Sequence, residues 1–175
     1  MGTARTTRKT ASAHACARAA AALLLAGALA LAGCQTAPYR KLTAQQVETL
    51  RQQGFHLTGL GWELDLSEKV LFGFDDDAIP PERQSNLRRI GQALLGAGID
   101  HVRLDGHTDD AGSTDYNLKL SLRRAQAIAG VLVSAGFARD DIEVRALGMS
   151  RPVADNHTPE GRAQNRRVAI IVTVD

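Results

Sequence analysis

Residues 101–134, HVRLDGHTDDAGSTDYNLKLSLRRAQAIAGVLVS, decide the fold. Polar and apolar residues alternate from His101 to Gly106, which predicts a β-strand. A polar loop follows, in which Gly112 permits a sharp turn. Apolar residues then recur at helical spacing from Thr114 to Ser134. A strand that leads through a short loop into a long helix predicts an α/β fold.

Further strands and a second helix are predicted on the N-terminal side of this unit. Residues 62–66 alternate between apolar and acidic, and residues 70–72 could pair with them in a hairpin. A helix is predicted to begin at Pro80-Pro81, because proline is tolerated in a first helical turn, and to continue until Gly96.

Two strands are predicted on the C-terminal side, over Ile142 to Ala146 and over Arg167 to Val174. The last strand is apolar on both faces, which is typical of a central strand with helices packed over it. Strands that alternate with helices in this order predict a two-layer α/β arrangement.

The helix predicted over 114–134 carries two adjacent arginines that differ in their position around the helix axis. Arg123 falls on a polar stripe with Lys119, Gln126 and Gly130, which we predict to face solvent. Arg124 falls on an otherwise apolar arc. A guanidinium among apolar side chains is costly unless it is paired, so Arg124 is expected to have a specific partner.

Asp109 is the nearest candidate partner for Arg124, because it lies in the loop between the strand and this helix. Two interpretations remain open. Either the two side chains form a structural ion pair, or they flank a gap that receives a ligand. A ligand with an ammonium and a carboxylate on one carbon would satisfy both, since Asp accepts from an ammonium and Arg meets a carboxylate with two parallel hydrogen bonds.

The same residues resemble the signature of a known family. Gly-His-Thr-Asp-x-x-Gly at 106–112, Tyr-Asn-x-x-Leu-Ser-x-x-Arg-Ala at 116–125, Gly148 with Pro152, and Asn-Arg-Arg-Val at 165–168 together resemble the OmpA-like peptidoglycan-binding domain. The resemblance implies that family's two-layer fold, a mixed β-sheet with two main helices packed on one face. It also implies that Asp109 and Arg124 bind the zwitterionic end of diaminopimelate in the peptidoglycan stem peptide. The other positions that match the family's pocket or its frame are Thr108, Asp110, Gly112, Asn117, Leu120 and Arg166.

The loop Phe72-Gly73-Phe74-Asp75 resembles the entry to the same pocket in that family, which implies that Asp75 lines it. The run 75–77 is three aspartates, which is more acidic than the family's usual run at this point. Hard cations prefer carboxylate oxygens, so a cation site is an alternative, but no EF-hand spacing supports it. We therefore expect no metal and no cofactor.

The N-terminus predicts export. Four basic residues and no acidic residue precede an Ala/Leu run from Ala19 to Ala32, which is the layout of a secretory signal peptide. The run is shorter than the roughly 20 apolar residues that a membrane-spanning helix needs. Leu31-Ala32-Gly33-Cys34 resembles a bacterial lipobox, which implies that Cys34 is lipidated after cleavage and that Gln35 directs the protein to the outer membrane. Two or more acyl chains would anchor it stably.

Charge and cysteine content narrow the function further. Without residues 1–33 the chain keeps 17 Lys and Arg against 19 Asp and Glu, so it lacks the basic surplus expected of a nucleic-acid-binding protein. Cys16 leaves with the signal peptide and Cys34 is consumed by lipid, so no disulfide is expected.

His101, Arg103, Asp105 and His107 share one strand face, and a metal or acid–base role there competes with a structural one. No catalytic motif is present, and we expect a binding protein without enzymatic activity.

A short amphipathic helix is predicted within the segment before Trp62. Thr43-Ala44-Gln45-Gln46 has the form of a capping box, and Val47 and Leu50 continue an apolar stripe until Gly54. A helix of this length is marginal alone, so it either docks on its own domain or binds a partner. We divide the chain into a signal peptide (1–33), a lipidated cysteine with linker (34–61) and an OmpA-like domain (62–175).

Residues 50–55, 61–63, 69–73 and 147–156 resemble the YfiB branch of the family. The branch consists of outer-membrane lipoproteins that capture a periplasmic repressor and so release an inner-membrane diguanylate cyclase. The resemblance implies that Val47, Leu50, Phe55 and Trp62 form the capture surface, on a lipid-anchored protein that faces the periplasm. A purely structural anchor between outer membrane and cell wall is the alternative.

Overall fold

The computed structural model describes residues 41–67 and 79–173 of the chain. These residues belong to one compact unit that begins at Arg40. The elements in chain order are α2 (Ala44–Gln52), β1 (His56–Thr58), β2 (Gly61–Ser67), α4 (Pro81–Gly96), β3 (Val102–His107), α5 (Thr114–Ala135), the 3-10 turn η1 (Arg139–Asp141), β4 (Ile142–Gly148), α6 (Pro159–Asn165) and β5 (Arg167–Val172).

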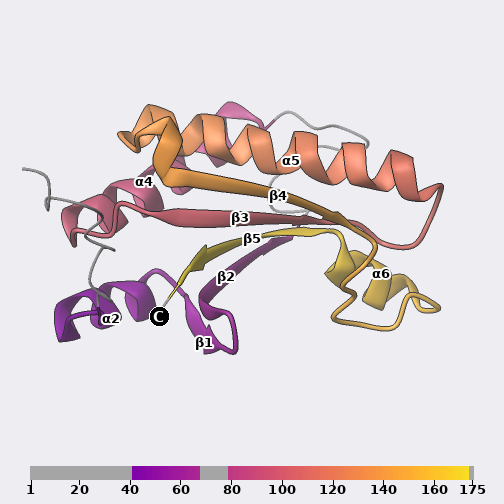
Figure 1. The fold of residues 1–175 in the computed structure, drawn as a ribbon, viewed down its shortest axis with the longest axis horizontal. Coiled ribbons are helices and arrows are strands. Elements are labelled where there is room, and N and C mark those ends of the chain that lie inside the picture. The colour runs from indigo at the N-terminus through magenta and orange to yellow at the C-terminus, as the bar shows by residue number, and fades with distance from the viewer. Residues whose placement is uncertain (1–40, 68–78, 174–175) are drawn as a thin grey trace, which may run out of the picture. The chain divides into compact units, whose positions relative to one another are not determined.

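The strands form one mixed sheet in the order β1-β2-β5-β3-β4 (Figure 1). Only β3 and β4 are parallel, and the other neighbours are antiparallel. The last strand, β5, lies at the centre with all six of its residues buried, as its apolar sequence predicted.

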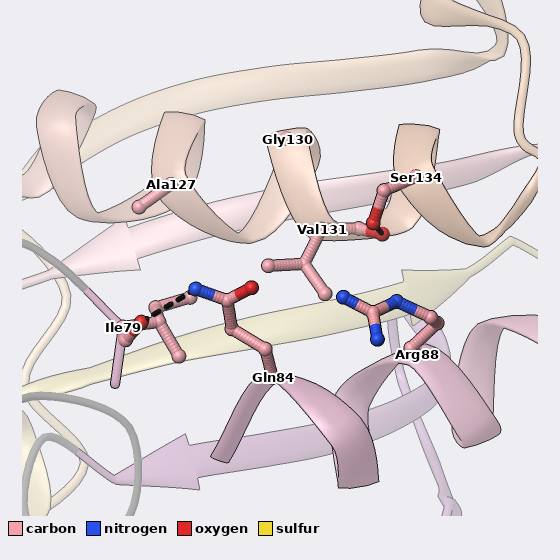
Figure 2. Close-up of a pocket in the computed structure, with 7 residues that line it drawn as sticks. All are labelled: Ile79, Gln84, Arg88, Ala127, Gly130, Val131 and Ser134. Carbon is pink, nitrogen blue, oxygen red and sulfur yellow. Dashed lines mark hydrogen bonds between the residues drawn. The ribbon is translucent and has the colours of Figure 1, made fainter. Parts of the chain in front are cut away.

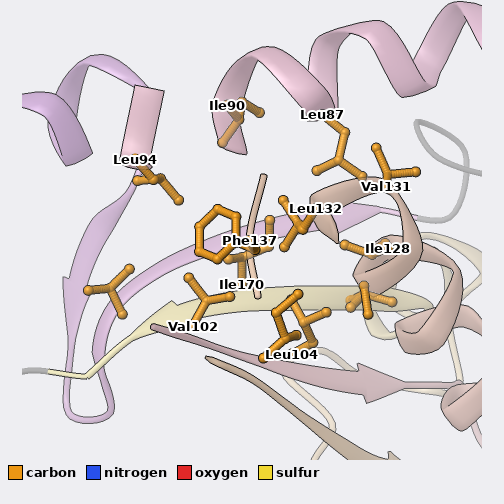
Figure 3. Close-up of a cluster of buried hydrophobic side chains, with 14 of the residues drawn as sticks. Leu87, Ile90, Leu94, Val102, Leu104, Ile128, Val131, Leu132, Phe137 and Ile170 are labelled. Carbon is orange, nitrogen blue, oxygen red and sulfur yellow. The ribbon is translucent and has the colours of Figure 1, made fainter. Parts of the chain in front are cut away.

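The two long helices pack over one face of the sheet and enclose the core. In Figure 3, Leu87 and Ile90 of α4 and Ile128 of α5 gather over Leu104 and Ile170 of the sheet. At 25 cal/mol per Å², each such buried side chain contributes about 1.5–3 kcal/mol to folding. The predicted two-layer fold, with a mixed sheet and two main helices on one face, is confirmed.

Helix α2 begins with the predicted capping box. The Thr43 hydroxyl accepts from the backbone of Gln46, and the Gln46 side chain accepts from the backbone of Thr43. The Gln46 amide also donates to the carbonyl of Gly98 at 3.1 Å, which ties α2 to the turn after α4. Gly54, with φ +88°, reverses the chain after the helix.

The apolar stripe of this segment faces inward, so the helix docks on its own domain, which was one of the two alternatives; capture of a partner by these residues stays a prediction. Leu50 is fully buried, Phe55 and Trp62 are buried, and Val47 is partly buried, all against the main core. The Arg51 guanidinium lies 5.7 Å from the centre of the Trp62 ring, a cation–π distance. Docking on its own domain removes this stripe from water, which a marginal helix needs for stability. The folded part therefore extends N-terminal to the predicted boundary at Trp62.

Two further differences concern short elements. The hairpin partner of β2 is β1, with Leu57 opposite Trp62, while the arm predicted at 70–72 lies outside the described residues. Helix α6 was not predicted, although Thr158 before Pro159 is a helix-start signal, and the Thr158 hydroxyl indeed accepts from the backbone of Gly161. Among the described residues, no helix combines the length and the apolar character needed to cross a bilayer.

Candidate functional site

The candidate site is built where β3 ends beneath α5. Gly106 lies so close to the helix that a Cβ at this position would overlap the carbonyl oxygen of Ser121. The Ser121 hydroxyl in turn accepts from the backbone of Gly148 at 3.1 Å, and the backbone of Thr108 donates to the carbonyl of Gly148 at 2.9 Å. The ends of β3 and β4 and the first half of α5 are thereby fixed relative to one another.

Side-chain hydrogen bonds hold the loop from Thr108 to Gly112 in one conformation. Asp109 Oδ1 accepts from the backbone of Ala111 at 3.2 Å, and the buried Asn117 amide donates to the carbonyl of Ala111 at 2.9 Å. Gly112 has φ +92°, a conformation that favours glycine. The loop conformation is thus specified by hydrogen bonds, which gives Asp109 a defined position.

Asp109 forms an ion pair with a residue distant in the sequence. Its Oδ2 accepts from Nη1 of Arg166 at 2.8 Å, and the Asp109 side chain is only 13% exposed. Sequence reasoning placed Arg166 in the frame of the pocket and did not foresee this bond. An ionised carboxylate offers about four acceptor positions, so the two bonds described here leave acceptor capacity on Asp109.

Arg166 is positioned by a hydrogen-bonded loop that the sequence did not reveal. The neighbouring Asn165 is fully buried and accepts from the backbones of Val153 and Ala154. Its amide donates to the carbonyl of Ala154 and to the side chain of Asn156, each at 2.8 Å. Asn165, the last residue of α6, therefore fixes the 153–156 loop beside Arg166, which lies between α6 and β5.

Arg124 is buried on α5, as the helical wheel predicted, with 5% of its surface exposed. The polar stripe with Arg123 is exposed, which confirms the predicted solvent face. Leu118 and Leu122, in the first half of the same helix, are 39% and 36% exposed. This half of α5 lies near Gly148 at the end of β4, which is the edge strand of the sheet.

The remaining predicted residues fall into three groups. Thr108 and Asn117 are buried and shape the loop, with the Thr108 hydroxyl donating to the carbonyl of Asp109. Asp110 and Gly112 are exposed at the loop surface, and Leu120 is half-buried. Asp75 and Cys34 lie outside the described residues.

His107 is buried at the end of β3. Burial, followed by the charges of Arg167 and Arg151, lowers the pKa of His107 to about 4. The ring is therefore neutral at physiological pH. In the described part of the chain, no group of His, Cys, Asp and Glu side chains could hold a metal ion.

A surface pocket of about 380 Å³ lies elsewhere, between α4 and α5 (Figure 2). Gln84, Arg88 and Ser134 provide its polar groups, and Ile79 and Val131 its apolar ones. None of the residues predicted from the sequence to bind a ligand lines it. The pocket is separate from the Asp109 loop.

Comparison with known proteins places these features in a family context. The sequence profile of the OmpA family matches residues 71–166. The chain is 53% identical over 148 residues to the outer-membrane lipoprotein YfiB of Pseudomonas aeruginosa, covering 84% of this chain and 88% of the relative. It is 41% identical to the peptidoglycan-binding protein ArfA of Mycobacterium tuberculosis, covering 59% of this chain and 32% of that longer protein.

A solved structure agrees with the fold. The peptidoglycan-associated lipoprotein from Burkholderia pseudomallei superposes with a TM-score of 0.53 at 31% identity. The match covers 61% of this chain and 87% of that one.

Proposed function

The chain belongs to the OmpA family and, within it, to the YfiB branch, and on that basis we propose that it is an outer-membrane lipoprotein that binds peptidoglycan non-covalently. The names of the relatives support this proposal, since one is an outer-membrane lipoprotein and another a peptidoglycan-binding protein. The observation that carries it is that α5 buries the Arg124 guanidinium, while the loop after β3 holds the Asp109 carboxylate in a fixed position through its bond to Arg166.

The proposed ligand group is the zwitterionic end of diaminopimelate in the stem peptide. Asp109 accepts from the ligand ammonium, and Arg124 meets the ligand carboxylate with two parallel hydrogen bonds. The ion pair with Arg166 orients the Asp109 carboxylate for this contact. Burial strengthens both interactions, because the effective dielectric constant is lower than in water.

Further residues contact the proposed ligand group or shape the loop around it. Asn117 and Gly112 keep the loop in shape, and Thr108 fixes the carbonyl of Asp109. Asp110 is exposed and free to reach the peptide. We propose that Asp75, in the sequence 72–75, lines the site that receives the same ligand group.

Lipidation of Cys34 would place the domain at the periplasmic surface of the outer membrane. Because α2 begins at Ala44, at most nine residues, 35–43, separate the proposed lipid from the folded unit. Nine residues reach about 30 Å when fully extended. The tether is therefore short.

Co-sedimentation of residues 35–175 with purified sacculi tests the proposal. Asp109→Asn removes the charge that holds the ammonium, and Arg124→Lys keeps the cation but removes the paired hydrogen bonds. We expect each variant to lose at least about tenfold in sacculus binding, the effect of roughly 1.4 kcal/mol. Arg123→Lys, on the solvent stripe, is the matched control and should bind as the wild type does. Wild-type binding by both site variants, with folding verified by circular dichroism, would make the pair structural.

A second role, capture of a periplasmic repressor that controls an inner-membrane diguanylate cyclase, is suggested by the relationship to the YfiB branch. Because Leu50, Phe55 and Trp62 are buried, we propose a capture surface on exposed residues of the same segment. Leu57 in β1 and Leu60 in the following turn are 63% and 45% exposed, respectively, and form the candidate surface. Leu57→Glu with Leu60→Glu should abolish capture in a pull-down and leave sacculus binding intact. Unchanged capture by this variant would mean that the capture surface lies elsewhere, and a wild-type chain that captures no repressor would leave the structural anchor as the better account.

A further inference from the structure

Strand β4 is the edge of the sheet on the side opposite to β1. It pairs with β3 on one side, and on its other side no strand follows in the part of the sheet that the structure describes (Figure 1). An edge strand offers a row of backbone N–H and C=O groups to any strand that can approach. Proteins usually block this approach with like charges, prolines or a covering segment.

The charges on β4 do not block a second copy of the same strand. Glu143 and Arg145 lie two residues apart, so they share one face, and both side chains are about half exposed. Arg145 Nε donates to Glu143 Oε1 at 2.7 Å within the strand. Glu143 and Arg145 are self-complementary at this spacing, because antiparallel pairing of two copies can bring Glu143 of one copy next to Arg145 of the other.

The register of such a pairing follows from the sequence of β4. If a two-fold axis passes through Val144, each Glu143 lies opposite Arg145 of the second copy, and Ile142 lies opposite Ala146. An axis through Glu143 would place glutamate opposite glutamate, and an axis through Arg145 would place arginine opposite arginine. An axis between two residues would set the core face of one sheet beside the polar face of the other. One register alone therefore satisfies both the charges and the faces.

The helix above this edge supplies apolar surface. Helix α5 packs on β4, and a Cβ built on Gly148, the last residue of β4, lies 3.2 Å from the backbone nitrogen of Leu118. Leu118 and Leu122 are both more than a third exposed. Strand pairing alone buries less than the roughly 1,000 Å² that a specific interface usually needs, so packing of Leu118 and Leu122 against α5 of the second copy would add the missing apolar area.

We propose that two copies of this chain associate through β4, antiparallel about Val144, to form a symmetric dimer with one continuous sheet. The contact uses neither side chain of the Asp109–Arg166 ion pair, so it does not depend on the proposed peptidoglycan binding. The dimer is expected to be weak in solution. Attachment to a membrane surface would raise the local concentration of the chain and favour it.

Charge reversal tests both the contact and its register. Glu143→Arg gives two arginines on each strand and Arg145→Glu gives two glutamates, so either variant alone meets like charges across the axis. We expect each to dimerise at least about tenfold more weakly than the wild type in sedimentation-velocity runs over a concentration series. An equimolar mixture of the two variants should recover wild-type association as a heterodimer, because a strand with two arginines then meets one with two glutamates. The double variant with the charges exchanged should recover it as a homodimer.

Three controls and outcomes decide the proposal. Lys119→Glu, a reversal on the solvent stripe of α5, should not change association. A wild-type chain that remains monomeric up to about 1 mM, the range reached by short tethers, overturns the proposal. So does wild-type association of either single variant, or a mixture that associates no better than its components. Sacculus binding should be unaffected in every β4 variant, which separates this test from that of the wall-binding site.

Discussion

Both faces of the central strands β3 and β5 are buried, but different forces stabilise them. On the helix face, Leu104 of β3 and Ile170 of β5 contact only apolar side chains of the core. On the other face, the same strands carry Arg103, Asp105 and Arg167, which are at most 9% exposed. Burial of apolar surface is non-directional, whereas a buried charge is tolerated only with a correctly placed partner.

The polar face satisfies that requirement through specific pairs. Arg103 Nε donates to Asp105 at 3.1 Å, and Arg167 Nε donates to Asp65 at 2.9 Å. Further nitrogens of this face, one each on Arg103, Arg167 and His107, are buried without a hydrogen-bond partner among the described residues. Changes of charge or pH should therefore alter stability through the polar face, and changes of side-chain volume should alter it through the apolar face.

Leu104→Ala should have the largest effect on stability. Leu104 is fully buried, and a cavity left by truncation of such a leucine costs about 4 kcal/mol of unfolding free energy. Urea denaturation followed by circular dichroism measures the loss. Leu60→Ala, at a position 45% exposed, is the matched control and should change stability by less than about 1 kcal/mol. Equal losses in the two variants would mean that the helix face is not the main core.

Asp105→Ala should cost about 3 kcal/mol, because it leaves the Arg103 guanidinium buried without its carboxylate. Replacement of both partners, Arg103→Met with Asp105→Leu, should restore stability to within about 1 kcal/mol of the wild type. The same denaturation assay compares the single and double variants. A double variant as unstable as the single one would show that the pair does not act as a unit.

Strands and helices could be predicted from the sequence wherever the pattern that indicates them lies within one element. Alternation and helical spacing located β3, β4, β5, α4 and α5, and the two-sided apolar pattern of β5 predicted its central position. The wheel predicted a buried Arg124 because direction around a helix follows from spacing alone. Each of these inferences uses residues within one element.

Contacts between distant segments could not be predicted. Arg166 pairs with Asp109 across 57 positions, and no local pattern indicates it. The stripe of α2 was visible, but its spacing is the same whether the helix docks on its own domain or on a partner. Strand β1 has three residues, too few for periodicity to show.

A pH titration should show a smaller effect, confined to the polar face. The folded-state pKa of His107 is about 4, and an unfolded histidine has a pKa of about 6.5. Neutral His107 thus stabilises the fold fully above pH 6.5, and this stability is lost as the pH falls toward 4. The loss amounts to at most about 3 kcal/mol and is measured by urea denaturation at each pH.

The matched variants His107→Gln and His101→Gln isolate this effect from that of the carboxylates. His107→Gln should flatten the pH dependence between pH 6.5 and 4 relative to the wild type. His101 is exposed, and its hydrogen bond with Asp100 raises its pKa, so it contributes stability below pH 6.5 that is lost as the pH rises. His101→Gln should therefore keep the acid-side loss. A wild-type slope in His107→Gln would show that the ring is not the titrating group.

The central position of β5 has a consequence for the order in which the protein can be assembled. Strand β5 joins β2 to β3 and is also the last strand to be synthesised. Until residues 167–172 emerge, the chain consists of two half-sheets with no strand to connect them. Completion of the fold must wait until residues 167–172 have been synthesised, because the pairings that close the sheet are the most distant along the chain. For a chain that carries the signal peptide predicted at 1–33, this delay would keep the polypeptide unfolded while it crosses the membrane.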